Sequence, residues 1–497
     1  MKHLLFIHGW SVTDTDTYGE LPERLAAEAG LTVQHLYLGK YISFHDEVRM
    51  DDIACAMEEA VKREIVLQPG ERFAAITHST GGPVVRTWWD RFYAHSGREC
   101  PMSHVIHLAA AQFGSSLAQL GKGRLSRMKG FFQGVEPGQG VLDWLELGSP
   151  EAWQLNQLWI HARGTVTGTA PVFSFSLIGQ QIDRKFYDQL NSYTGEMGSD
   201  GVVRVAASNL NASAVRLVQR TPTANQLRTR TASALTMDSA ELEESERVPF
   251  RIVPAAAHSG EKMGIMRSVE KSGAAPVVGL IKRCLKINDE AGYFQLAAEF
   301  EAENRDLVES ERVEVEDRLL LGDRIFFHDP CSMVILRVTD DHGYVPDDLR
   351  VLFTAGDGQH GDPNRLPKGF LIDTQRNSRH RGTITFFLNH DVIHGCKRIY
   401  YDEKGKRRVA RDPLPGIKNL GITIEAFPNE GFAHYHKAYA SPSPELLSRM
   451  IRPHSTVLVD VVLKRIIHRN TMDLTADLKP GSFKKTPPGP ALGLDTP

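Results

Sequence analysis

An apolar strand that runs through a small-residue turn directly into a helix constrains this chain most. Residues 73–76 are apolar, residues 77–82 read Thr-His-Ser-Thr-Gly-Gly, and Pro83 falls in the predicted first helical turn. Proline suits that place because it has no N–H to lose and its φ fits a helix. A strand that meets a helix in this way is typical of a parallel sheet with crossover helices.

Ser79 stands at the tip of this turn, where it looks like the serine of a nucleophile elbow. An elbow lifts the serine Oγ clear of the sheet, and the next backbone N–H, that of Thr80, can face an oxyanion. Thr77 departs from the usual Gly-x-Ser-x-Gly pattern, because glycine is favoured where strand and helix cross closely. The alternative is a helix that merely begins with Ser-Thr capping residues after a buried strand.

Further apolar runs recur along the first half of the chain, with helical stretches between them. The runs cover residues 4–7, 32–38, 72–77, 105–110, 172–178 and 250–253. Residues 51–66 place apolar side chains at helical spacing amid charges, which predicts an amphipathic helix on one face of a sheet. The alternation predicts an α/β fold with a mostly parallel sheet, whose ligands bind beyond the carboxyl ends of the strands.

The run 4–7 ends in His8-Gly9-Trp10, and a strand followed by His-Gly resembles the oxyanion loop of the α/β-hydrolase family. The resemblance implies an α/β-hydrolase core over residues 1–285. It also implies that the backbone N–H of Trp10 is the second oxyanion donor beside Thr80. An ordinary βα loop with a glycine is the alternative for a lone His-Gly.

A serine hydroxyl is a weak nucleophile until an imidazole takes its proton and a carboxylate orients the imidazole. In this fold the order is serine, acid, histidine, with the histidine in a loop after the last core strand. Of the 20 histidines, His258 meets that description, because it follows the strand 250–253. We therefore predict His258 as the base that serves Ser79.

Two aspartates compete for the role of the acid. Asp200-Gly-Val-Val resembles the acid-bearing segment of many bacterial lipases and of lecithin:cholesterol acyltransferase-like enzymes. Asp183 follows a core strand directly. Asp200 is favoured because small flanking residues and the apolar run after it would fix its loop against the sheet. A turn-forming aspartate is the alternative at either position.

Two insertions interrupt the predicted catalytic domain. Residues 112–165 are rich in Gly, Leu, Phe and Trp and are expected to form a lid-like insertion. Its apolar side chains would either line an acyl-chain pocket or roof the sheet as core. Residues 221–247 have little apolar periodicity and are expected to form an exposed polar loop.

Short alternating strands replace the helical spacing beyond about residue 286. Residues 333–338, 349–353, 382–388 and 457–463 predict a β-rich accessory domain over 286–478, built as an antiparallel β-sandwich. The turns at 340–343 and 356–358 suggest calcium, but turn chemistry is the better interpretation because no dense set of ligands appears. Residues 479–497, rich in Pro and Gly, predict a disordered tail.

Composition excludes several other classes of protein. The net charge of −3 gives no electrostatic footprint for nucleic acid. The five cysteines form no CxxC pair, so neither zinc nor a disulfide framework is expected, and no cofactor is expected. No segment is long enough to span a membrane, and no signal peptide precedes His8. We expect a cytoplasmic location, or export without a cleaved signal peptide.

These observations favour a serine ester hydrolase with a Ser79-Asp200-His258 triad, a lipase or phospholipase that touches a membrane surface transiently. A lipase core without a signal peptide also resembles the antibacterial lipase effectors of type VI secretion systems, which implies an immunity or secretion partner. Two alternatives stay open: a non-catalytic binding protein with the hydrolase fold, and an acyltransferase that moves the acyl group to an alcohol.

Overall fold

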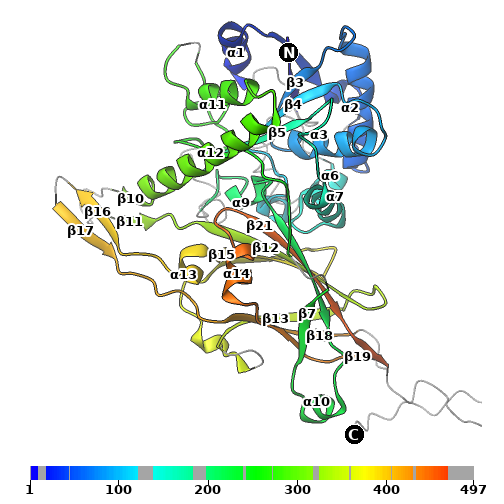
Figure 1. Ribbon diagram of the computed structural model, residues 1–497, viewed down its shortest axis with the longest axis vertical. Helices are drawn as coiled ribbons and strands as arrows, with labels where there is room; N and C mark the ends of the chain where they lie inside the picture. The colour runs from blue at the N-terminus through cyan, green and yellow to red at the C-terminus, as the bar shows by residue number, and fades with distance from the viewer. Residues whose placement is uncertain are drawn as a thin grey trace, which may run out of the picture.

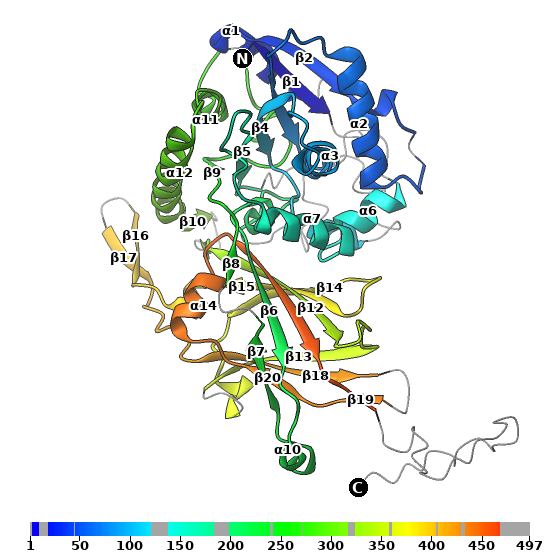
Figure 2. The same cartoon turned by 45° about the vertical axis from the view of Figure 1, so that its right-hand side comes forward.

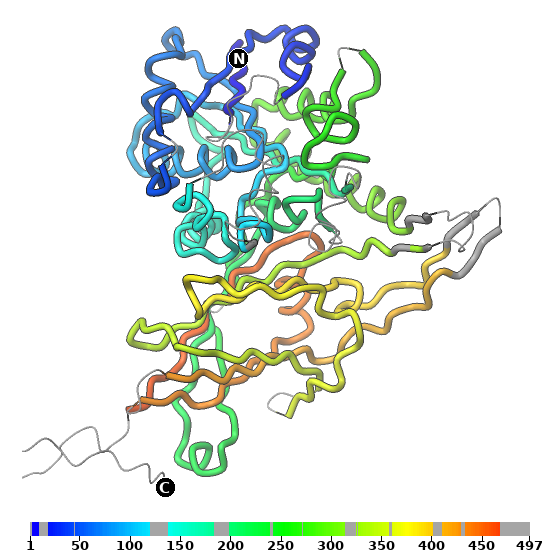
Figure 3. Tube along the Cα trace, turned by 180° about the vertical axis from the view of Figure 1, so that it is seen from behind, coloured from blue at the N-terminus to red at the C-terminus, as the bar shows by residue number. Residues whose placement is uncertain are grey.

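The computed structural model describes residues 2–8, 18–43, 45–120, 138–182, 198–238, 242–270, 272–316, 324–356, 360–403, 406–428 and 433–467. Two layered parts lie one above the other in Figure 1, a helix-covered sheet that holds the N-terminus and a β-rich part below it. The tube in Figure 3 shows the same division from behind. Among the described residues, every helix is too short or too polar to cross a membrane.

The upper part is built on a six-stranded sheet in the order β2-β1-β3-β4-β5-β9, in which every pair of neighbours is parallel. Its strands are β1 (His3–His8), β2 (Thr32–Tyr37), β3 (Phe73–His78), β4 (Met102–Leu108), β5 (Phe173–Gly179) and β9 (Phe250–Val253). Each strand coincides within a few residues with one of the predicted apolar runs. The apolar runs are continuous because helices cover both faces of a parallel sheet.

Those covering helices lie on opposite faces of the sheet. Figure 2 shows α11 (Pro276–Leu285) and α12 (Glu290–Ser310) on one side and α2 (Met50–Glu64) and α3 (Gly81–Trp89) on the other, and α1 (Leu21–Ala29) contacts α11. Helix α2 buries one apolar stripe that includes Ile53, Met57 and Val61, as its spacing predicts. The predicted α/β fold with a mostly parallel sheet is confirmed.

The lower part is a ten-stranded sheet that folds over on itself. Its order is β13-β18-β20-β7-β6-β21-β12-β15-β14, and β8 pairs with β6. Phe353 on β13 packs edge-on against Phe386 on β15, so the two ends of the sheet face each other as the layers of a sandwich. The strands are β6 (Ser213–Gln219), β7 (Ser233–Met237), β8 (Glu243–Glu244), β12 (Cys331–Asp340), β13 (Asp348–Ala355), β14 (Leu371–Arg376), β15 (Thr383–Asn389), β18 (Leu420–Phe427), β20 (Ala438–Ala440) and β21 (Thr456–Leu463).

Most pairings in this sandwich are antiparallel, as expected, but β21 runs parallel to both β6 and β12, and β20 runs parallel to β7. Shorter elements complete this part of the chain. They are the strand pairs β10 (Val313–Glu316) with β11 (Arg324–Phe327), β16 (Ile399–Glu403) with β17 (Lys406–Arg411) and β19 (Ala433–Tyr435) with β22 (Arg465–Ile467), and the helices α10 (Ala224–Thr229), α13 (His390–His394) and α14 (Pro444–Met450).

The segment 221–247 differs from the expected exposed loop. It contributes α10, β7 and β8, and it buries Leu235 and Leu242 in the core of the sandwich. Strand β7 pairs with β20, about 200 residues later in the chain. Its other neighbour is the preceding strand β6, with which it pairs antiparallel. The pairing with the distant β20 leaves no local signal in the sequence. The chain therefore enters the sandwich at β6, returns to the first sheet at β9 and enters the sandwich again.

The expected boundary at residues 285/286 also differs from the structure, because α12 belongs to the first part. Asn304 of α12 pairs with the edge strand β9 as a neighbouring strand would: its Oδ1 accepts from the Ile252 N–H at 2.8 Å, and its Nδ2 donates to the Phe250 carbonyl at 2.8 Å. Tyr293 donates to the Ser174 carbonyl at 2.7 Å. A charged helix thus covers an edge strand that would otherwise expose its hydrogen-bonding groups.

The described part of the insertion 112–165 roofs the first sheet. It forms α6 (Gln139–Leu145) and α7 (Pro150–His161), and its apolar residues Phe113, Leu142 and Trp144 are buried in the core. Residues 121–137 lie outside the described residues. The same insertion contacts the sandwich, where the Glu146 carboxylate accepts from the Ser378 N–H at 2.6 Å and from its Oγ at 2.8 Å. The two parts of the molecule therefore share an extensive junction.

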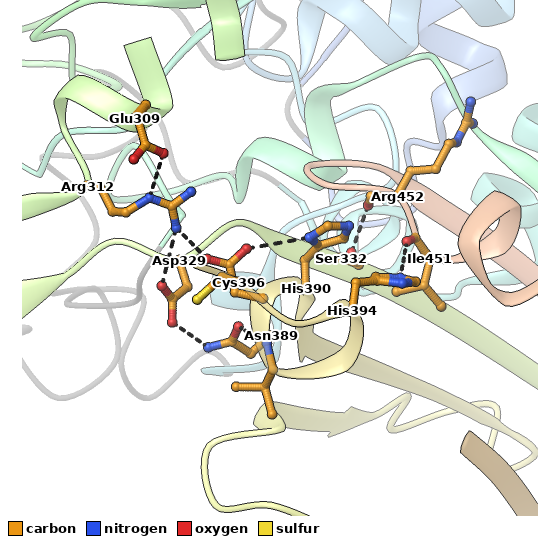
Figure 4. Close-up of polar contacts among 12 residues, drawn as sticks. Glu309, Arg312, Asp329, Ser332, Asn389, His390, His394, Cys396, Ile451 and Arg452 are labelled. Carbon is orange, nitrogen blue, oxygen red and sulfur yellow. Dashed lines mark hydrogen bonds and ion pairs between the residues drawn. The ribbon is translucent and has the colours of Figure 1, made fainter. Parts of the chain in front are cut away.

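A cluster of charged side chains around the buried carboxylates of Asp329 and Asp391 lies at another side of this junction. Arg312, which follows α12, contacts Glu309 at 2.9 Å and also pairs with Asp391. Figure 4 shows Arg312 pointing between Glu309 and Asp329, with His390 and His394 of α13 on the sandwich side. Arg411 binds both carboxylate oxygens of Asp329 at 2.6 and 2.8 Å. The cluster ties the end of α12 to the sandwich.

Candidate active site

The turn after β3 holds Ser79 in a strained backbone conformation. Its φ of 52° lies in the left-handed region, which a residue other than glycine adopts only where the surroundings impose it. Here the Ser79 N–H donates to the Leu108 carbonyl at 3.2 Å, and the Ser79 carbonyl accepts from the Ala111 N–H at 3.3 Å. Helix α3 begins two residues later. This is the geometry expected of a nucleophile elbow.

Thr77, which stands in place of the usual glycine, is fully buried and is accommodated by a hydrogen bond and by two glycines. Its Oγ1 lies 2.9 Å from Nδ1 of His107, whose pKa burial lowers to about 3, so that the ring stays neutral. A Cβ on Gly81 would lie 3.4 Å from the Thr77 Cβ, and a Cβ on Gly82 would lie only 2.5 Å from Ala110. The close approach of helix to strand is thus preserved at Gly82 rather than at position 77.

Asp200 and His258 form a buried pair near this turn. Oδ2 of Asp200 lies 2.9 Å from Nδ1 of His258, and the two side chains are 0% and 1% exposed. The other carboxylate oxygen accepts from the N–H groups of Val202 and Val203 at 3.0 and 2.8 Å. The His258 N–H also donates to the Asp200 carbonyl at 2.9 Å. Side chain and backbone therefore fix the imidazole relative to the carboxylate.

Glycines let the two loops that carry this pair approach each other and the sheet. Gly198 and Gly201, on either side of Asp200, have φ values of 72° and 100°. At the end of β5, a Cβ on Gly179 would lie 1.9 Å from the carbonyl oxygen of Ala256. No side chain fits there, so the loop after β9 can lie directly over the end of β5. That close approach sets the position of His258, which this loop carries.

His78, the residue before Ser79, was not singled out from the sequence. Its ring packs on the ring of His258 with centroids 4.6 Å apart, and its Nε2 donates to the His258 carbonyl at 3.2 Å. Burial, together with the neighbouring His258, lowers the pKa of His78 well below its usual value. His78 therefore supports the loop of His258 with a neutral ring. The only sign of this role in the sequence is its place next to the serine of the elbow.

The sequence-predicted site residues are therefore brought to one edge of the sheet. Ser79 follows β3 and His258 follows β9, both at carboxyl ends of strands, and Asp200 contacts His258. Thr80 is the N-cap residue of α3, and its carbonyl accepts from the Val84 N–H at 3.3 Å. Trp10 and the alternative acid Asp183 lie outside the described residues.

His8, at the end of β1, packs into an aromatic group beside this edge. Its Nε2 lies 2.9 Å from Nδ1 of His35, and its ring stacks on Tyr37 at 4.2 Å. Burial lowers the pKa of His8 to about 3. A neutral His8 therefore anchors the start of the predicted oxyanion loop by packing and hydrogen bonding rather than by charge.

Within the part of the chain that the structure describes, no three His, Cys, Asp or Glu side chains gather as a metal site would require. The turn at Asp340, considered for calcium, serves its own backbone: Oδ1 accepts from the N–H groups of His342 and Tyr344 at 2.9 Å each. Turn chemistry accounts for this aspartate.

A strained serine at the end of a central parallel strand, beside a buried Asp–His pair, defines the class of α/β-hydrolase-fold serine ester hydrolases. Two solved structures of phospholipase PlaB from Legionella pneumophila are similar to this chain along nearly its whole length. One, in complex with thio-NAD, is 37% identical, with 99% of each chain covered and a TM-score of 0.80. The other is 39% identical, with 97% of each chain covered and a TM-score of 0.81.

The chain belongs to the family of phospholipase PlaB. No protein-family model matches it, and no curated protein sequence does. The prediction of an α/β-hydrolase fold and of a serine ester hydrolase of the lipase class is confirmed at the level of this family.

Proposed function

We propose that this protein is a phospholipase that cleaves carboxylic esters through an acyl-serine on Ser79. The observation that carries the proposal is the buried contact of 2.9 Å between Asp200 and His258 beside the strained turn that presents Ser79. Ser79 is half-buried beside this pair. A carboxylate that orients an imidazole next to a serine hydroxyl is the arrangement that makes serine nucleophilic. The phospholipid substrate follows from membership of the PlaB family.

His258 removes the Ser79 hydroxyl proton as Oγ attacks the ester carbonyl carbon. The tetrahedral oxyanion then collapses, the bond to the leaving alcohol breaks, and the imidazolium returns the proton to that alcohol. In the second half, water attacks the acyl-serine and gives a proton to His258. The bond between the acyl carbon and Ser79 Oγ then breaks, the imidazolium returns the proton to Oγ, and a fatty acid leaves. Asp200 holds the imidazole by Nδ1 and stabilises its charged form throughout.

The N–H of Thr80 is one donor to the oxyanion, because it is the residue after the nucleophile at the start of α3. The partial positive charge at the N-terminal end of that helix favours the same negative oxygen. The second donor, the N–H of Trp10, stays a prediction from the α/β-hydrolase resemblance.

Labelling with a fluorophosphonate probe, followed by peptide mapping, tests the nucleophile. We expect the adduct on Ser79. Ser79→Ala should abolish labelling and lower phospholipid hydrolysis by roughly 10⁴-fold, because the variant lacks the nucleophile. The variant should still fold, because only the hydroxyl group is removed. Ser96→Ala, at a serine remote from the site, is the matched control and should keep full activity. Full activity in Ser79→Ala would rule out the proposal and favour another nucleophile.

Product analysis separates the two alternatives. With a phospholipid of defined chains, hydrolysis releases free fatty acid, whereas acyl transfer to an added alcohol yields a new ester. A protein that binds the lipid, is not labelled and releases neither product would be a non-catalytic relative. A panel of short-chain esters, triglycerides and phospholipids on vesicles would define the substrate and any contact with the membrane surface.

One PlaB structure is a complex with thio-NAD. We propose that this chain also binds a nicotinamide dinucleotide, and the support is sequence identity over the whole length of that protein. Calorimetric titration with thio-NAD should show saturable binding, and its absence at millimolar concentration would contradict the proposal. Export as a type VI effector and an immunity partner stay predictions, which secretion assays and co-purification from the producing cell would test.

A further inference from the structure

We propose that Arg204 is a positioning residue for Asp200, and that through Arg204 the β-sandwich completes the active site. The inference rests on the proposed triad. It concerns the acid loop, defined here as residues 198–204, which carries Asp200 toward His258 on one side and Arg204 toward the sandwich on the other.

The acid loop is a tight, closed turn. Ser199 and Arg204 form an antiparallel bridge, and the Val205 N–H donates to the Gly198 carbonyl at 2.8 Å. Inside the turn the Asp200 N–H donates to the Val203 carbonyl at 3.2 Å. Because these bonds connect the two ends of the loop, a displacement of Arg204 is transmitted to the backbone of Asp200.

Two residues of the sandwich contact the Arg204 side chain. It is 2% exposed, and its Nη2 lies 3.2 Å from Oδ2 of Asp373 on β14. Its guanidinium carbon lies 3.8 Å from the ring centroid of Phe387 on β15. A planar cation stacked on an aromatic face and paired with a carboxylate is held in both position and orientation.

The next turn of chain is held by the sandwich as well. Helix α9 (Val205–Ser208) follows Arg204, and the Thr456 hydroxyl of β21 donates to the Ala206 carbonyl at 2.8 Å. From the insertion, the Ser115 hydroxyl donates to the Val202 carbonyl at 2.8 Å. The acid loop thus lies between the hydrolase core and the sandwich. Strands β14, β15 and β21 of the sandwich contact this loop and the helix that follows it.

This placement gives the sandwich a catalytic consequence. An acid that sits about 1 Å away from its proper position costs roughly 100-fold in rate. Loosening Arg204 should therefore lower kcat while leaving ester binding nearly unchanged, because Arg204 acts through Asp200 and does not touch the substrate.

The same junction contains a matched contact that does not lead to the acid loop. Nε of Arg337 on β12 lies 3.0 Å from Asp460, and its guanidinium carbon lies 4.3 Å from the ring of Trp153 in α7. Arg337 therefore uses the same chemistry between the same two parts of the molecule. The Arg337 side chain is one third exposed whereas that of Arg204 is buried, so the kcat values of their variants are compared at matched Tm.

The experiment compares full-length Arg204→Met, Arg204→Lys, Asp373→Asn and Arg337→Met with the parent enzyme. We expect Arg204→Met to lower kcat on a soluble ester about 10- to 100-fold with KM within about twofold. Arg204→Lys should recover part of that loss because it keeps the charge. The kcat of Asp373→Asn should lie between those of Arg204→Met and the parent enzyme. Arg337→Met should keep kcat within about twofold, even where its Tm falls as far as that of Arg204→Met.

Full kcat in Arg204→Met, or an equal loss in Arg337→Met at matched Tm, would overturn the inference. If Arg204→Met does not fold, Asp373→Asn decides, because Asp373 lies on the sandwich surface and is one third exposed. Parent kcat in a folded Asp373→Asn together with Arg204→Lys would then overturn it. Ser79→Ala distinguishes the two proposals: an inactive Ser79→Ala beside a fully active Arg204→Met removes the positioning role alone.

Discussion

The pair of Asp200 with His258 in the first part of the molecule and the pair of Asp391 with His390 in the sandwich differ in what else the aspartate binds. Asp200 lies 2.9 Å from His258 and otherwise accepts from two backbone N–H groups. Asp391 lies 3.6 Å from its neighbour His390, but it also pairs with Arg312 and lies 3.7 Å from Arg411. The first aspartate faces an imidazole and amides, and the second faces two guanidinium groups.

That difference separates a catalytic carboxylate from a structural one. Burial alone would raise the pKa of Asp391, but its contacts with His390 and Arg312 lower it below the usual value. The two arginines already neutralise the charge of Asp391, so this carboxylate would stabilise an imidazolium only weakly. Asp200 accepts instead from two backbone N–H groups, and its other oxygen faces the imidazole that becomes charged during ester cleavage. An Asp–His contact therefore predicts chemistry only once the other partners of the carboxylate are known.

The largest expected effect is on catalysis at the first pair. Asp200→Asn should lower kcat by roughly 10⁴-fold, because the amide no longer stabilises the imidazolium or fixes its tautomer. Asp391→Asn, measured below its melting temperature, should keep kcat within about threefold. Steady-state kinetics on one soluble ester checks both variants, and comparable losses in the two would erase the distinction between the pairs.

Stability should respond in the opposite sense. Asp391→Asn leaves Arg312 short of a buried partner and should lower the free energy of unfolding by about 3 kcal/mol. Asp329→Asn, in the same cluster, should act alike because it pairs with Arg411. Urea unfolding monitored by circular dichroism measures the change. A shift of less than about 0.5 kcal/mol would show that the cluster is not a structural anchor.

Acid should destabilise the protein through its buried neutral histidines. Burial lowers the pKa of His454, which lies near His390, to about 4. The unfolded chain binds a proton there near pH 6.5 but the folded chain does not, so stability is present above pH 6.5 and is lost as the pH falls toward 4. The loss is on the order of 3 kcal/mol for one such group. His454→Gln should give a shallower dependence of unfolding free energy on pH between 6.5 and 4, and an unchanged slope would contradict this.

The smallest effect is expected at the elbow itself. Thr77→Val keeps the shape of the side chain but removes the hydrogen bond to His107, so it should cost about 1 kcal/mol of stability with kcat changed only a few-fold. Thr77→Ser keeps the hydroxyl and serves as the control. A large loss of kcat in Thr77→Val alone would give the Thr77–His107 contact a direct part in holding Ser79.

The sequence predicts the first sheet well because each parallel strand is a continuous apolar run with a helix after it. Ser79 and His258 are predictable for the same reason, since each follows such a strand, and small neighbours mark Asp200. Arg204 is not predictable. Its partner Asp373 is 169 residues away, and their contact depends on how the sandwich folds. The same holds for one edge of β7, which pairs with β20 from the far end of the chain, whereas its other edge pairs with the preceding strand β6.

The rate at which a fluorophosphonate labels Ser79 tests the central claim most directly, because it reports activation of the serine without substrate binding or product release. The account predicts fast labelling in the parent and in Asp391→Asn, and labelling at least about 100-fold slower in Asp200→Asn. Equal labelling rates in Asp200→Asn and the parent would contradict the claim that the buried Asp200–His258 pair activates Ser79.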